Sequence, residues 1–247
     1  MARTQNLSEY LTDIATAIKT KKGDETPINA SKFDEEIVNL PTGEDIYEYF
    51  TEGNLKSGYY FIRKCIKKIP MIDISNITTM VQGFQDCENL EGIPSLDTSN
   101  VTTMENLFMA CKSIKEIPPL NTSKVTNMKN IFRSCETIEE LPSFDASLVV
   151  VLSDAFAFCN LLKEFGGLIN IGQAYLTTTS ANYSNYKFNL SYSNNLTHDS
   201  LMNVINNLYD IKSKGCNTQQ LVLGSTNLAK LTAEEINIAV EKGFSVS

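Results

Sequence analysis

Six cysteines and one histidine are the residues of this 247-residue chain best suited to metal or nucleophilic chemistry. No Cys-x-x-Cys pair offers the spacing of a zinc site, and His198 follows Thr197 at the start of an expected helix, where a polar residue needs no catalytic role. The sequence also lacks a glycine-rich phosphate loop and a Gly-x-Ser-x-Gly elbow. We therefore expect no enzymatic activity, no catalytic residue, no cofactor and no metal site.

Four of the cysteines belong to an internal repeat, because they recur every 24 residues. Columns of similar residues share this period throughout residues 70–165. Three of the apolar columns are Cys87, Cys111, Cys135 and Cys159; Phe84, Phe108, Phe132 and Phe156; and Met80, Met104, Met128 and Leu152. A reduced cysteine that faces inward behaves as a small apolar side chain, so we interpret the cysteine column as core.

Each repeat unit is predicted to contain a short helix followed by a short strand. Val101, Met104, Phe108 and Cys111 are spaced three, four and three residues apart, which places them on one face of a helix that begins after the polar residues 97–99. Neither element can bury its apolar face alone, so consecutive units must stack with their strands in a parallel sheet. The predicted fold class is α/β, a solenoid of 24-residue helix-strand coils.

Two charged columns bear on the stacking, since equivalent residues of neighbouring coils lie about 4.8 Å apart. One column alternates in sign and favours this register by about 0.2–1 kcal/mol per pair: Lys67, Glu91, Lys115, Glu139 and Lys163. The adjacent column becomes acidic: Lys68, Gly92, Glu116, Glu140 and Glu164. Either solvent screens these carboxylates or a partner uses them. The candidate ligand-contact face therefore consists of Glu91, Lys115, Glu116, Glu139, Glu140, Lys163 and Glu164.

The units PSLDTSNVTTMENLFMACKSIKEI and PPLNTSKVTNMKNIFRSCETIEEL resemble the bacterial surface-protein class of leucine-rich repeats known as BspA-like. The resemblance covers residues 70–165. It implies a curved right-handed leucine-rich repeat solenoid that serves binding rather than catalysis, and it specifies no ligand.

The flanks of the repeat should cover its apolar ends. Residues 44–69 are predicted to form an N-terminal cap, with a strand at 58–65. Residues 166–247 are interpreted as longer, divergent leucine-rich coils that continue the same sheet, with strands at 188–193 and 221–225. Helices are expected from Thr197 to about Tyr209 and from a capping box at Thr232 and Glu235 to Val240, with Gly243 at the stop.

Residues 1–43 lie outside the repeat and are predicted to form a helical hairpin. The pattern L-x-x-I-A-x-A-I, a turn with glycine, and P-I-x-x-S-x-F-x-x-E-I resembles the N-terminal segment of many phage tail and baseplate proteins. That resemblance implies assembly with other virion proteins or with copies of the same chain. The candidate attachment face consists of Leu7, Leu11, Ile14, Ile18, Phe33 and Ile37. The alternative is that the hairpin packs on the solenoid as a cap.

Charge and hydropathy limit the functional classes. The net charge of −8 argues against nucleic-acid binding, and no apolar run approaches the 18 or so residues of a membrane span. The first twenty residues lack a secretory signal pattern. We expect a virion protein of the tail tip, baseplate or fibre, folded in the host cytoplasm, that binds a host-surface glycan or protein. The alternatives are a host-encoded BspA-like adhesin and a purely structural virion protein.

Overall fold

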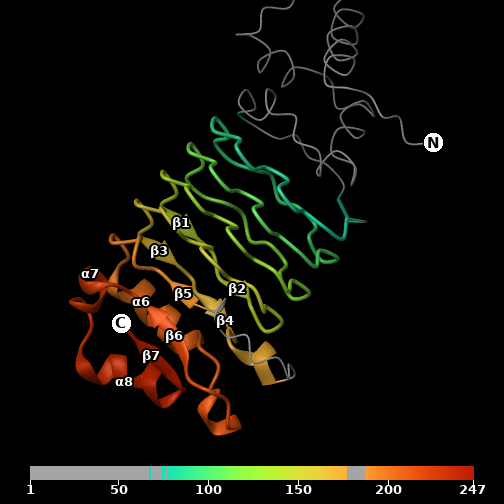
Figure 1. The fold of residues 1–247 in the computed structure, drawn as a ribbon. Helices are drawn as coiled ribbons and strands as arrows, with labels where there is room; N and C mark the ends of the chain where they lie inside the picture. The colour runs from blue at the N-terminus through green and yellow to red at the C-terminus, as the bar shows by residue number, and fades with distance from the viewer. Residues whose placement is uncertain (1–66, 68–73, 76, 177–186) are drawn as a thin grey trace, which may run out of the picture.

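The computed structural model describes residues 67, 74–75, 77–176 and 187–247, so the attachment segment predicted at 1–43 and nearly all of the cap predicted at 44–69 lie outside the described residues. Figure 1 shows the described chain as successive coils stacked side by side, followed by a helical C-terminal part. The strands and helices are β1 (Glu140–Leu141), β2 (Phe144–Asp145), β3 (Glu164–Phe165), β4 (Leu168–Ile169), β5 (Lys187–Asn189), α6 (His198–Asn207), β6 (Gln219–Val222), α7 (Ser225–Leu228), α8 (Ala233–Glu241) and β7 (Phe244–Val246), with 3-10 helices at Gln173–Leu176 and Lys212–Lys214.

Neighbouring coils pair in parallel at an offset of 24 residues. In the pair β1–β3, Glu140 lies opposite Glu164, and in the pair β2–β4, Phe144 lies opposite Leu168. Single parallel bridges form a third ladder through Thr79, Thr103, Asn127 and Val151. The structure therefore has the register that the charged columns predict.

The prediction of a short helix in each unit is wrong, because the chain forms consecutive tight turns in the segment before each repeat cysteine. Leu107, Met109 and Cys111 each donate the backbone N–H to the carbonyl three residues earlier. The alternate N–H groups donate instead to carbonyls of the next coil, at 2.7–2.9 Å: Met104 to Asn127, Asn106 to Lys129, Phe108 to Ile131, and Ala110 to Arg133. Asn106 and Ala110 have φ values of 57° and 62°, in the left-handed region that a right-handed helix excludes.

A row of phenylalanine rings runs through the core from coil to coil. The ring centroids are 5.4 Å apart for Phe84 and Phe108, 5.5 Å for Phe108 and Phe132, and 6.0 Å for Phe132 and Phe156. Phe188 of β5 continues the row at 6.0 Å from Phe156, and all five side chains are buried. These spacings are favourable for aromatic pairs, so the row joins the repeats and the C-terminal part in one core.

The interpretation of the cysteine column as core is confirmed, since all four residues are buried and have free thiols. Each of the last three thiols donates to a carbonyl of the preceding coil: Cys111 Sγ to Phe84 O at 3.0 Å, Cys135 Sγ to Phe108 O at 3.1 Å, and Cys159 Sγ to Phe132 O at 3.1 Å. Burial raises the pKa of the Cys159 thiol to about 12. A neutral thiol can donate this hydrogen bond, whereas metal binding requires a thiolate.

The C-terminal part contains the helices and strands expected there. Strands β5, β6 and β7 form a parallel sheet in that order. Thr197 caps α6, and Thr232 and Glu235 form the predicted capping box of α8. Gly243 follows with a φ of 98°, as expected for a helix stop. The sequence analysis did not anticipate α7 and β7. No helix within the described ranges has the length and apolar character needed to cross a bilayer.

The two expected C-terminal strands do not continue the sheet of the coils, because β5 and β6 form a separate sheet with β7, and α6 lies beside β3. Among the described residues beyond β4, the parallel pairing continues only through a single bridge between Ile171 and Leu208. Ser200 Oγ accepts the Phe165 N–H at 3.0 Å, and the Asn207 amide donates to Gly166 O at 3.0 Å. Polar side chains of α6 thus satisfy backbone groups that a further strand would otherwise pair. At Gly167, which has a φ of 89°, a Cβ atom would lie 2.9 Å from the Asn207 amide nitrogen, so this close approach requires glycine.

Candidate ligand-contact face

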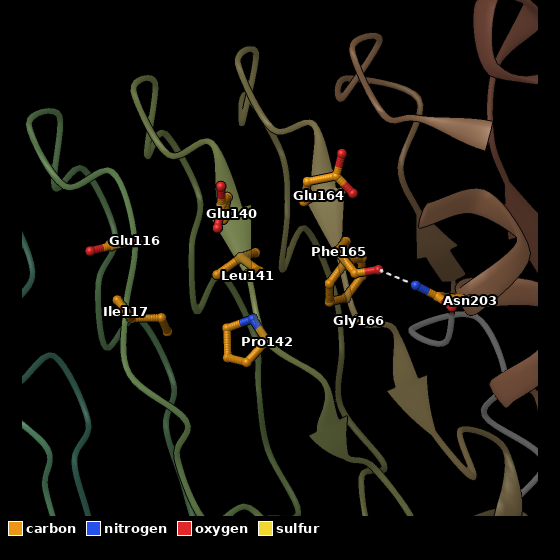
Figure 2. Close-up of a pocket in the computed structure, with 9 residues that line it drawn as sticks. All are labelled: Glu116, Ile117, Glu140, Leu141, Pro142, Glu164, Phe165, Gly166 and Asn203. Atoms are coloured by element: carbon orange, nitrogen blue, oxygen red, sulfur yellow. Dashed lines mark hydrogen bonds between the residues drawn. The ribbon is translucent and has the colours of Figure 1, made fainter. Parts of the chain in front are cut away.

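Three glutamates from consecutive coils lie in line at the centre of the predicted ligand-contact face. We call Glu116, Glu140 and Glu164 the carboxylate column (Figure 2). Each is exposed and directly precedes a buried apolar residue, namely Ile117, Leu141 and Phe165. Since successive side chains of an extended segment point to opposite sides, burial of the second residue turns the carboxylate outward.

The carboxylate column borders an open pocket of about 340 Å³. Its lining residues are Glu116, Ile117, Glu140, Leu141, Pro142, Glu164, Phe165, Gly166 and Asn203. Figure 2 shows Asn203 of α6 at one end of the pocket, with its amide directed toward the Phe165 carbonyl. The pocket therefore forms where the last repeat meets α6, with hydrogen-bond acceptors at its rim.

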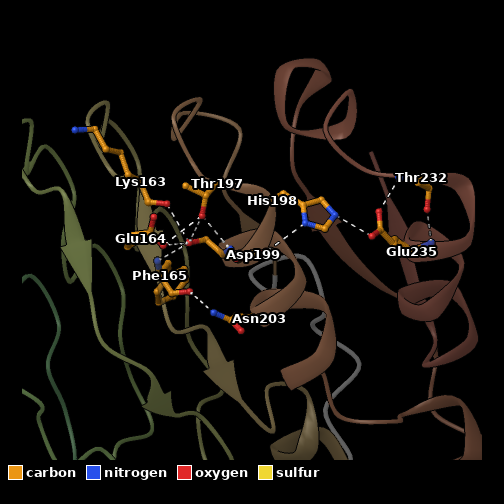
Figure 3. Close-up of polar contacts among 10 residues, drawn as sticks. Lys163, Glu164, Phe165, Thr197, His198, Asp199, Asn203, Thr232 and Glu235 are labelled. Atoms are coloured by element: carbon orange, nitrogen blue, oxygen red, sulfur yellow. Dashed lines mark hydrogen bonds and ion pairs between the residues drawn. The ribbon is translucent and has the colours of Figure 1, made fainter.

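The three carboxylates differ in their partners. Glu164 Oε2 lies 3.1 Å from Ser200 Oγ and 3.3 Å from Thr197 Oγ1, so α6 orients this carboxylate (Figure 3). The carboxylates of Glu116 and Glu140 have no hydrogen bond or ion pair with any residue that the structure describes. Two members of the column are thus available to a ligand.

One pair of opposite charges in the alternating column is in contact across coils. Lys163 Nζ lies 2.9 Å from Glu139 Oε2, and this hydrogen bond and charge lower the pKa of the Glu139 carboxyl. Glu91 and Lys115 are exposed on the same face but do not line the pocket. The structure therefore divides the predicted face: Glu139 and Lys163 contact each other, whereas Glu116, Glu140 and Glu164 border the pocket.

His198 connects the two longer C-terminal helices. Its Nε2 atom lies 2.8 Å from Glu235 Oε1, and Glu235 Oε2 accepts the Thr232 N–H in the capping box of α8 (Figure 3). The hydrogen bond that His198 donates to the Glu235 carboxylate, followed by the contact with the Asp199 carboxylate at 3.5 Å, raises the pKa of His198. These contacts give the single histidine a structural role between α6 and α8. In the described part of the chain, no group of three or more His, Cys, Asp and Glu side chains is placed to hold a metal ion.

The sequence analysis missed an exposed aromatic pair. The rings of Phe158 and Tyr192 have centroids 4.7 Å apart, and the two residues are 39 % and 41 % exposed. The sequence did contain a signal for this pair, because Phe158 is the one large aromatic residue in its column of the repeat. The equivalent residues are small: Asp86, Ala110 and Ser134.

Comparison with family models matches residues 53–166 to a family described as "Mycoplasma protein of unknown function, DUF285". Comparisons with curated proteins and with solved structures each found no match. The matched segment contains all four 24-residue units and does not include residues 1–52. The repeat region of this chain is therefore similar to that family, which supports the BspA-like resemblance of the repeat.

Proposed function

We propose that this protein is a non-enzymatic binding protein of a phage virion, at the tail tip, baseplate or fibre. In this proposal the stacked coils form a leucine-rich repeat solenoid that contacts the host surface. The observation that carries the binding role is the pair of exposed carboxylates of Glu116 and Glu140, which have no partner among the described residues and lie on a face fixed by a buried core.

The carboxylate column supports binding of a partner rich in hydrogen-bond donors. Ionised carboxylates accept hydrogen bonds and offer no donor, so hydroxyl, amide or ammonium groups are their complements. Equivalent positions of neighbouring coils repeat at about 4.8 Å, and the buried side chains beneath them hold this spacing. An extended surface glycan or a loop of a surface protein can place several donors along such a row.

Residues 1–43 supply the second half of the proposal. Their resemblance to phage tail and baseplate segments supports attachment to other virion proteins through the predicted apolar stripe. Deletion of these residues should prevent incorporation into particles, while the remaining fragment should still bind host cells. Incorporation of the shortened protein at normal copy number would contradict this attachment role.

A host-encoded surface adhesin is the second candidate, because the repeat units resemble the BspA-like class of bacterial surface proteins. Both candidates use the same binding face, so they differ in where the protein is displayed. Recovery of the protein from the cell envelope, and not from purified particles, would favour the adhesin. A structural virion protein without a receptor would be found in particles but would not bind cells.

Charge reversal tests the binding face. We expect Glu140→Lys to lower binding of the fluorescently labelled protein to host cells at least about tenfold, because the new ammonium group cannot accept a hydrogen bond. Glu136→Lys is the matched control, since this exposed residue of the same coil lies outside the pocket. Equal binding by the two variants, with unchanged circular dichroism, would refute the assignment.

A further inference from the structure

Phe158 has a backbone conformation that is unfavourable for an aromatic residue. Its φ of 63° lies in the left-handed region, where a bulky aromatic residue is an outlier. The equivalent residues have φ values of 61–62° and small side chains: Asp86, Ala110 and Ser134. The coil geometry therefore requires a left-handed residue here, but it does not require a large ring. An aromatic residue in this unfavourable conformation at the surface suggests a use other than folding.

The Phe158 ring lies in an aromatic and polar cluster. Tyr192, three residues beyond β5, packs against it with the ring planes inclined at 43°. The Arg133 guanidinium lies 5.5 Å from the centroid of Phe158 and is held by an ion pair of 2.8 Å with Asp154. The side chains of Arg133 and Asp154 are 33 % and 50 % exposed. The cluster thus combines two partly exposed rings with a hydrogen-bond donor and a hydrogen-bond acceptor.

We propose that Phe158 and Tyr192 form a stacking platform for one sugar ring of a neutral glycan, with Arg133 and Asp154 binding its hydroxyl groups. The C–H bonds on one side of a pyranose ring carry slight positive charge and pack on the negative face of an aromatic ring. Arg133 donates hydrogen bonds and Asp154 accepts them, so together they match hydroxyl groups, which do both.

Two observations favour a neutral glycan over other partners. The charges of Arg133 and Asp154 cancel locally, and the whole chain carries a net charge of −8, so neither attracts an anionic polymer. The apolar part of the cluster consists of the rings of Phe158 and Tyr192, which is small for the core of a protein–protein interface. This inference names the ligand class for the proposed binding function and therefore rests on it.

Titration with neutral tetrasaccharides tests the platform. Chitotetraose, maltotetraose and cellotetraose would each be added to the full-length protein up to about 10 mM, with calorimetry and saturation-transfer NMR as readouts, which detects a Kd of about 1 mM. We expect at least one to bind. Tyr192→Ala should weaken that binding at least about tenfold, whereas Tyr192→Phe should retain it within about twofold because the ring remains.

Leu148→Ala is the matched control, since Leu148 is an exposed apolar residue outside the cluster. Absence of binding to all three sugars, or equal binding by Tyr192→Ala and the control variant, would overturn the platform. Cell binding that is lost in Glu140→Lys but unchanged in Tyr192→Ala would overturn the platform and leave the proposed function standing. Unchanged cell binding in both variants would overturn the stacking platform and the proposed binding function.

Discussion

Removal of one ring from the phenylalanine row should destabilise the whole stack of coils. Phe108 is fully buried, and its ring contacts those of Phe84 at 5.4 Å and Phe132 at 5.5 Å. A buried Phe→Ala change typically raises the free energy of the folded state by about 3–5 kcal/mol through lost transfer energy and an unfilled cavity. Coils on both sides hold the backbone, because the Phe108 N–H donates to Ile131 O in the next coil and Leu107 O accepts the Phe84 N–H of the preceding coil. The cavity therefore cannot close easily. We therefore expect about 4–5 kcal/mol for Phe108→Ala.

Urea unfolding at 25 °C, followed by circular dichroism, measures this loss. Thr103→Ala is the control in the same coil, because Thr103 is half-buried and joins its ladder through backbone atoms. That change should alter the free energy of unfolding by no more than about 0.5 kcal/mol. Similar losses for the two variants would show that the phenylalanine row is not the core of the stack.

Three further predictions concern α6, the cysteines and the histidine. Ser200→Ala should lower the free energy of unfolding by about 1–3 kcal/mol in urea, because a buried N–H of β3 loses its acceptor. Alkylation at pH 8, followed by peptide mass spectrometry, should label the partly exposed Cys216 long before Cys159, whose thiol is buried with a pKa of about 12. The contact with Glu235 raises the pKa of His198 above its ordinary value of 6.5, so the stability it adds is present below about pH 6.5 and is lost as the pH rises through the raised pKa. The melting temperature should therefore decrease as the pH rises from about 6.5 through the raised pKa, and His198→Gln should make this decrease smaller.

Each of these predictions has a result that contradicts it. Asn206→Ala, at an exposed position of α6, should leave the free energy of unfolding nearly unchanged. If Ser200→Ala changed this free energy no more than Asn206→Ala does, Ser200 would have no stabilising role at the edge of β3. Rapid alkylation of Cys159 in the folded protein would show that the cysteine column is open to solvent. A pH profile of melting that His198→Gln leaves unchanged would show that the histidine does not couple α6 to α8.

The repeat period, the register and the inward columns could be predicted because they depend on residue types that recur every 24 positions. The helix within each unit could not be judged from that pattern. A spacing of three and four residues suits both a helix and two linked turns, and the difference lies in the partner of each N–H group. Phe108 N–H donates to Ile131 in the next coil, which no local pattern reveals.

The candidate site was also predictable only in part. The sequence places Glu116, Glu140 and Glu164 in one column, and the structure has Glu140 and Glu164 opposite each other. Which carboxylates have partners depends on Thr197 and Ser200, more than thirty residues beyond Glu164 in the chain. The aromatic pair was missed for the same reason, since Phe158 and Tyr192 belong to different structural units and their contact crosses the boundary between them.

Mass spectrometry of purified phage particles tests the central proposal most directly. Particles would be induced from the strain that carries the gene, purified by density gradient and digested, and the cell-envelope fraction would be analysed in parallel. The proposal predicts peptides of this chain in the particles at a constant ratio to known tail proteins. Peptides found in the envelope fraction and absent from the particles would contradict it.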